Sequence, residues 1–120
     1  MSMKATIRQV NTVTVVDLSG RITLGEGCTQ LRELIRDLLS KGHKRLLLNL
    51  ADVTYIDSSG IGELVSGFTA VSNQGGQLKL LNLTKKVHDL LQITKLLTVF
   101  DVHEDEAKAV ASFDKGTAAS

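Results

Sequence analysis

The stretch RLLLNLADVTYIDSSGIG, residues 45–62, runs from an almost unbroken apolar segment into a polar loop with two glycines. An apolar run such as residues 45–50 is typical of a central strand that is covered on both faces of a sheet. After the loop, apolar residues return at the spacing of one helical face, namely Ile61, Leu64, Val65 and Phe68. The stretch therefore predicts a buried strand, a turn and an amphipathic helix that runs toward Gly75 and Gly76.

The segments before this stretch predict a hairpin and a first helix. Residues 13–18 are rich in β-branched and apolar side chains, and they predict a strand that pairs with residues 4–8 through a turn at 9–12. Residues 28–40 carry an apolar stripe at helical spacing, and Gly42 suits the left-handed position after a helix.

The segments after the stretch continue the alternation. Residues 78–83 predict a strand, and Val87, Leu90 and Leu91 predict one face of a helix. Residues 99–102 predict a short strand, and Ala107, Val110 and Ala111 predict a last helix. Alternating strands and helices predict an α/β fold with a mostly parallel sheet, an antiparallel N-terminal hairpin and about four helices.

Length and composition restrict the possible partners. A chain of 120 residues forms one compact domain, which we expect over residues 1–113, with a flexible polar tail at 114–120. The chain has 14 Lys and Arg residues and 13 Asp and Glu residues, so its charges nearly balance. This balance gives no electrostatic field that would attract nucleic acid or an acidic membrane surface. The single cysteine, Cys28, cannot form an internal disulfide, and no apolar stretch would span a membrane. We therefore expect a cytoplasmic protein with no membrane insertion.

The loop at residues 57–62 has two interpretations. In the structural one, Asp57, Ser58 or Ser59 caps the following helix, while Gly60 and Gly62 permit close packing. In the functional one, an exposed serine at the helix N-terminus accepts a phosphate where free N–H groups and the helix dipole favour negative charge. A phosphate there, close to Asp57, would repel a docked protein.

Residues 49–62 resemble the signature of anti-sigma factor antagonists with STAS domains. The likeness extends from residues 18–22 through residues 75–78 to the last helix. The resemblance implies a bacterial regulator of transcription that is not an enzyme. It further implies binding to an anti-sigma factor with serine kinase activity, release on phosphorylation, and restoration by a serine phosphatase.

The resemblance also implies roles for single residues. Ser58 corresponds to the phosphoacceptor, with Ser59 as a helix cap or alternative acceptor. The expected partner-binding residues are Asp57, Ser58, Ser59, Gly60, Ile61, Gly62, Arg21 and Thr23. Family members often have an acidic residue at the position of Thr23, so Thr23 is either part of the docking surface or a loop residue that satisfies its own backbone.

Other chemistries find little support in the sequence. His43, His88 and His103 lack the spacing of a metal site, and we expect neither a metal nor a cofactor. The two serines lack the glycine pattern of a nucleophile elbow, no histidine is identifiably tied to an acidic residue, and the glycine pairs complete no nucleotide-binding fingerprint. Cys28 is either a small packing residue or a thiol whose pKa the helix N-terminus lowers.

Two rival functions stay open. The first is an accessory subunit of a transporter or signalling complex whose serine is never modified. The second is a small ligand-binding protein or enzyme, which would need a concave pocket with convergent polar groups at the Ser58 loop.

Overall fold

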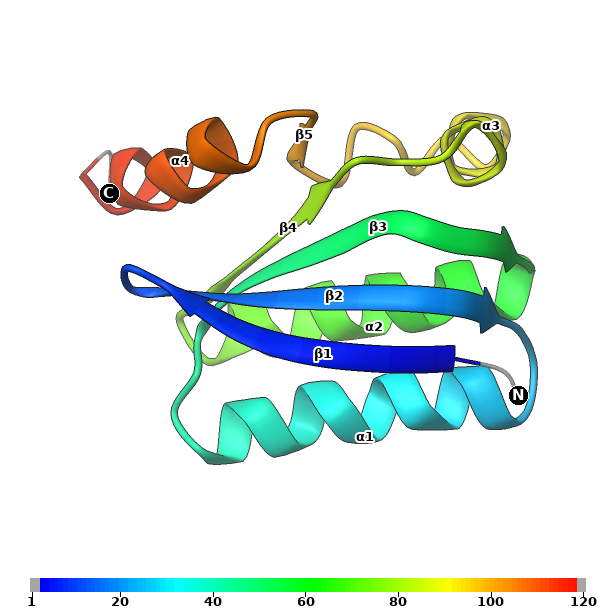
Figure 1. Cartoon of the computed structure of the whole chain (residues 1–120), viewed down its shortest axis with the longest axis horizontal. Coiled ribbons are helices and arrows are strands. Elements are labelled where there is room, and N and C mark those ends of the chain that lie inside the picture. The colour runs from blue at the N-terminus through cyan, green and yellow to red at the C-terminus, as the bar shows by residue number, and fades with distance from the viewer. Residues whose placement is uncertain (1–2, 119–120) are drawn as a thin grey trace.

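The computed structural model describes residues 3–118 of the chain, and in it five strands form one mixed sheet in the order β1-β2-β3-β4-β5. β1 (Met3–Val10) pairs antiparallel with β2 (Val13–Ile22), whereas β3 (Arg45–Ile56), β4 (Gln77–Leu81) and β5 (Val102–His103) continue in parallel. The helices are α1 (Glu26–Ser40), α2 (Ser58–Asn73), α3 (Lys85–Ile93) and α4 (Glu106–Ala118). This arrangement, shown in Figure 1, confirms the predicted α/β fold with its antiparallel hairpin and four helices.

The β1–β2 hairpin closes more tightly than the sequence suggested. Val10 pairs directly with Val13, so the turn consists of Asn11 and Thr12 alone. Asn11 has a φ of 55°, a left-handed conformation that asparagine tolerates better than most residues.

Two apolar cores lie on opposite faces of the sheet. On one face, alternate residues of β3, namely Leu46, Leu48 and Leu50, share a core with α1, α2 and α3. On the other face, Leu47 packs with Val13, Val15, Leu81, Ala109, Val110 and Phe113, the last three from α4. Figure 1 shows α4 and α1 on opposite sides of the sheet, which confirms that β3 is a central strand covered on both faces.

Several element boundaries differ from the predicted ones. α1 begins at Glu26 because the preceding Gly25 turns the chain with a φ of 97°, and no side chain caps this helix. β3 continues without a break from the apolar run to Ile56. β5 contains only Val102 and His103, so the predicted strand at 99–102 begins too early.

The C-terminal helix reaches into the segment that the sequence predicted as a tail. The α4 backbone continues to Ala118, and its side chains are described as far as Asp114. Residues 119–120 lie outside the described part of the chain, so a domain boundary at residue 113 stays a prediction.

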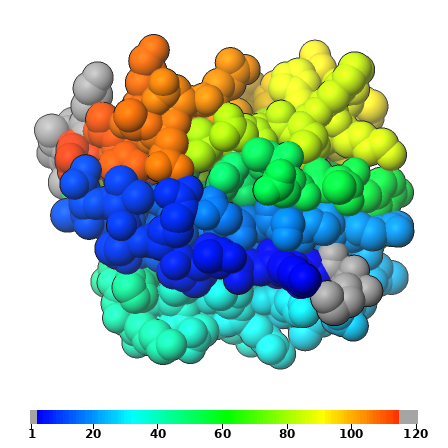
Figure 2. All heavy atoms as spheres, viewed as in Figure 1, coloured from blue at the N-terminus to red at the C-terminus, as the bar shows by residue number. Residues whose placement is uncertain are grey.

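The sheet also has an uncovered surface. Figure 2 shows β1, β2 and β3 reaching the surface as a band between α1 at the bottom of the view and α3 and α4 at the top. Among residues 3–118, no helix is both long and apolar enough to cross a membrane.

Candidate functional site

The loops that follow β2 and β3 meet at the carboxyl ends of these two parallel strands. Ile22 and Ile56 are register partners, so Asp57 begins its loop beside the end of β2. The Asp57 N–H donates to the carbonyl of Ile22 at 3.4 Å, and the Leu24 N–H donates to Oδ2 of Asp57 at 3.0 Å. The other oxygen, Oδ1, accepts the Gly60 N–H at 2.8 Å. A single carboxylate therefore caps α2 and ties the two loops together.

The electrostatics of Asp57 follow from these contacts. Burial by itself raises the pKa of the Asp57 carboxyl, but the backbone N–H groups of Leu24, Gly60 and Ser59 outweigh it and leave the pKa below its ordinary value. Asp57 is therefore ionised at neutral pH, and its carboxylate accepts the N–H groups of Ser59 and Gly60 in the first turn of α2. In the functional interpretation of the sequence, free N–H groups at this helix N-terminus favoured a phosphate.

Gly60 lets the first turn of α2 lie close against the end of β2. A Cβ atom on Gly60 would lie 2.2 Å from the carbonyl oxygen of Ile22 and 2.6 Å from Cγ1 of Ile56. A Cβ atom on Gly62, by contrast, would meet no atom within 4 Å. The expectation of close packing is confirmed for Gly60 and is wrong for Gly62, which faces outward.

The two serines have different environments. Ser58 is the first residue of α2 and is exposed, whereas Ser59 is half-buried. Of the three residues considered as a cap, Asp57 accepts the capping hydrogen bond. Ser58 thus presents its hydroxyl at a helix N-terminus whose cap does not depend on it.

The remaining predicted partner-binding residues divide into buried and exposed groups. Ile61 is only 2% exposed and belongs to the core, so it holds α2 in place and cannot itself contact a docked protein. Thr23 is half-buried, and its carbonyl accepts the Cys28 N–H at 3.1 Å. Arg21 is exposed and lies over the ring of Tyr55, a residue that sequence reasoning did not single out.

An open groove of about 530 Å³ runs beside the loop between the first turns of α1 and α2. Its lining is Leu24, Gly25, Cys28, Thr29, Arg32, Ser59, Gly62, Glu63 and Ser66. Ser58 is not part of this lining, and Arg32 is engaged with Glu63, with 3.2 Å between Nε and Oε1. The groove therefore reaches the loop at Ser59 and does not include the exposed Ser58.

One group of side chains resembles a catalytic triad in composition but not in geometry. Nε2 of His103 lies 3.3 Å from Oγ of Ser112 and 3.1 Å from Oδ2 of Asp101. Both partners approach the same ring nitrogen, whereas a triad places the acid on one nitrogen and the nucleophile on the other. The same carboxylate oxygen of Asp101 also pairs with Nζ of Lys79 at 2.9 Å. The histidine–acid pair that the sequence had not revealed is thus part of a structural network beneath α4.

Cys28 lies close to the loop but is not an activated thiol. Burial raises the pKa of Cys28, and the nearby carboxylates of Asp57 and Glu63 raise it further. This agrees with the packing role and contradicts the alternative of a lowered pKa. Within the described residues, no group of three or more His, Cys, Asp or Glu side chains gathers in a way that could hold a metal ion.

Comparisons with known proteins identify relatives of this chain. A model of the STAS domain family matches residues 4–109. The anti-sigma-B factor antagonist of Bacillus subtilis is 34% identical over 102 residues, which cover 85% of this chain and 92% of that protein.

Solved structures give the same result for the fold. The crystal structure of a candidate anti-sigma factor antagonist from Thermotoga maritima superposes with a TM-score of 0.80 at 25% identity, covering 92% of this chain and 94% of the other. A Bacillus cell fate determinant solved in its phosphorylated form superposes with a TM-score of 0.71 at 20% identity, covering 91% and 98% of the two chains.

Proposed function

The chain belongs to the STAS domain family, with anti-sigma factor antagonists among its relatives, and we propose that it is itself an antagonist that phosphorylation of Ser58 turns off. The family is non-enzymatic, so the chain acts by binding. Its proposed partner is an anti-sigma factor with serine kinase activity, and a serine phosphatase reverses the modification. We place this exchange in the cytoplasm, where ATP is available to the kinase.

The observation that carries this proposal is the separation of two roles within the loop. Asp57 holds the loop with both carboxylate oxygens, and Ser58 stands exposed at the start of α2 with no part in that cap. An external kinase can therefore reach the Ser58 hydroxyl without unfolding the helix. Modification leaves the fold intact and changes only the surface.

The charge of a phosphate explains the release. A phosphoserine carries a charge of about −1.5 to −2 at neutral pH. Since the carboxylate of Asp57 already accepts the N–H groups of Ser59 and Gly60, we expect a phosphate on Ser58 to project outward, next to an existing negative charge. A partner docked over this loop would then face a concentrated negative charge, which weakens binding.

Substitutions at the two serines test the assignment. Ser58→Ala is expected to fold normally and to stay bound to the anti-sigma factor in the presence of ATP, because it removes only the phosphoacceptor. Ser58→Asp is expected to bind more weakly. Peptide mapping after incubation with the kinase is expected to place one phosphate on Ser58 in the wild-type protein.

Ser59→Ala is the matched control. Because Asp57 is the cap, this variant is expected to keep the parent stability within about 0.5 kcal/mol and to respond to the kinase as the wild type does. Phosphate on any other residue, or equal affinity of Ser58→Ala and Ser58→Asp in calorimetric titrations, would reject Ser58 as the switch.

A further inference from the structure

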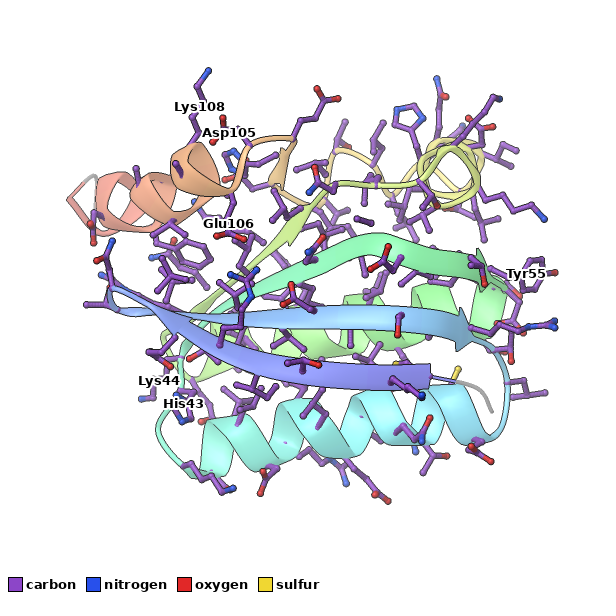
Figure 3. The ribbon with its side chains drawn as sticks, viewed as in Figure 1. His43, Lys44, Tyr55, Asp105, Glu106 and Lys108 are labelled. Carbon is purple, nitrogen blue, oxygen red and sulfur yellow. The ribbon has the colours of Figure 1, made fainter. Side chains whose placement is uncertain are left out.

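A charged aromatic cluster lies at the same end of the sheet as the Ser58 loop. Tyr55, close to the end of β3, is 38% exposed. The guanidinium carbon of Arg21, near the end of β2, lies 5.2 Å from the centroid of the Tyr55 ring, and Nζ of Lys86, from the first turn of α3, lies 4.9 Å from it. We call Arg21, Tyr55 and Lys86 the basic aromatic patch; Figure 3 shows Tyr55 at this end of β3.

The charges of the patch have no acidic partner in the described part of the chain. Neighbouring cations differ in this respect: Lys85 pairs with Asp89 at 2.9 Å, and Arg32 pairs with Glu63. Among residues 3–114, whose side chains the structure describes, neither Arg21 nor Lys86 forms an ion pair with a carboxylate. Three elements thus bring two uncompensated positive charges to one exposed ring.

The patch has the composition of a protein-binding surface. Tyrosine and arginine are enriched at interfaces, where they combine a large contact area with hydrogen-bonding tips. Contact with the ring also holds the two flexible cationic side chains in place, so less conformational entropy is lost when they bind. An arginine and a lysine held together in this way select carboxylates.

We propose that the basic aromatic patch docks an acidic segment of the anti-sigma factor, which extends the docking surface from the Ser58 loop across β2 and β3 to α3. The identity of this partner rests on the proposed function above. Charge complementarity gives the acidic character, since the patch is positive and exposed. It also explains the sign of the switch, because an acidic partner surface next to the loop is repelled by a phosphate on Ser58.

The test is a double variant, Arg21→Gln with Lys86→Gln, and a single variant, Tyr55→Ala. The double variant is expected to bind the anti-sigma factor about fivefold to tenfold more weakly at low salt, chiefly through slower association, and to show a flatter salt dependence. Tyr55→Phe keeps the ring and is expected to bind like the wild type, while Tyr55→Ala is expected to weaken binding. Thermal melts check that each variant is folded.

A double variant at distant lysines, Lys44→Gln with Lys108→Gln, removes the same charge elsewhere. Figure 3 shows Lys44 at the opposite end of the sheet from Tyr55, and Lys108 on α4. This control is expected to retain the wild-type affinity. If it loses as much affinity as the patch variant, or if the patch variant loses none, the inference is wrong.

Two further measurements separate this inference from the proposed function. If Ser58→Asp weakens binding while the patch variant does not, only the acidic docking surface is rejected. Independently of any anti-sigma factor, a nuclear magnetic resonance titration with hexaglutamate is expected to shift the signals of Arg21, Tyr55 and Lys86, and hexalysine is expected to leave them unchanged. If hexaglutamate shifts the signals of exposed lysines outside the patch equally, or shifts no signals, the inference is overturned even if the Ser58 switch operates.

Discussion

At the scale of single residues, Asp57 explains more of the site than either serine does. It accepts hydrogen bonds from both loops, which lowers the pKa of its carboxyl despite burial. A carboxyl whose pKa is lower in the folded chain than in the unfolded one stabilises the fold above the unfolded pKa, about 3.9, and this stabilisation is lost as the pH falls through the folded value. We therefore expect the hydrogen bonds of Asp57 to stabilise the loop at neutral pH and this stabilisation to be lost in acid.

Asp57→Asn tests this linkage. The amide retains one acceptor oxygen, so it can cap α2 or accept the Leu24 N–H, but it cannot do both. We expect a loss of about 1 kcal/mol at pH 7 and faster hydrogen exchange at Leu24. The difference in melting temperature from the wild type is expected to shrink as the pH falls below about 3.9, the unfolded pKa, and to be lost once the pH passes below the lower pKa of the folded carboxyl. A difference that is the same at pH 7 and pH 3 would contradict the assigned role.

At the scale of elements, the contact between the start of α2 and the end of β2 decides where Ser58 is held. Gly60 permits this contact, because a Cβ would collide with the backbone of Ile22, which cannot move aside as a side chain can. We expect Gly60→Ala to cost about 3 kcal/mol, at the upper end of typical overpacking effects, and to weaken binding of the anti-sigma factor by displacing the loop.

Gly62→Ala is the control for this prediction. It places a methyl group in open space on the same helix, two residues further on. Since alanine favours a helix over glycine by about 0.5–1 kcal/mol, this variant is expected to be slightly more stable than the parent. Chemical denaturation of the two variants measures both effects, and similar free energies of unfolding would show that α2 and β2 are not in close contact at Gly60.

At the scale of the whole molecule, β3 carries both cores, so its centre tests the architecture. Leu47 is fully buried against α4. An unpaired carboxylate there costs several kcal/mol, against a total stability of about 5–15 kcal/mol. We expect Leu47→Asp to unfold the domain at 25 °C by circular dichroism. Ile7→Asp, at a position of β1 that is 43% exposed, is expected to stay folded.

The sequence predicted those features that local patterns encode. The alternation of apolar segments was enough for the strands, the helices and the α/β class, and the glycine after α1 was correctly placed in a left-handed turn, with a φ of 88° at Gly42. Ser58 was placed at a helix entry because a polar loop precedes an apolar helical stripe. Each of these signals lies within one element or its immediate flanks.

What the sequence could not predict depends on register between distant segments. The Leu24 N–H reaches Asp57 only because β2 and β3 pair Ile22 with Ile56. In the same way, Arg21 and Lys86 reach Tyr55 from two other elements, so the patch has no local pattern. The Asp57 cap was one of three possibilities until its hydrogen bonds distinguished it from Ser58 and Ser59.

The most direct test of the central claim is the affinity of the anti-sigma factor for this protein before and after phosphorylation at Ser58. Calorimetric titration of both forms, with matched thermal melts, separates a change in binding from a change in folding. We expect the phosphorylated form to keep the melting temperature of the unmodified form within a few degrees and to bind at least about tenfold more weakly. If the phosphorylated protein binds as tightly as the unmodified one, Ser58 is not the release switch.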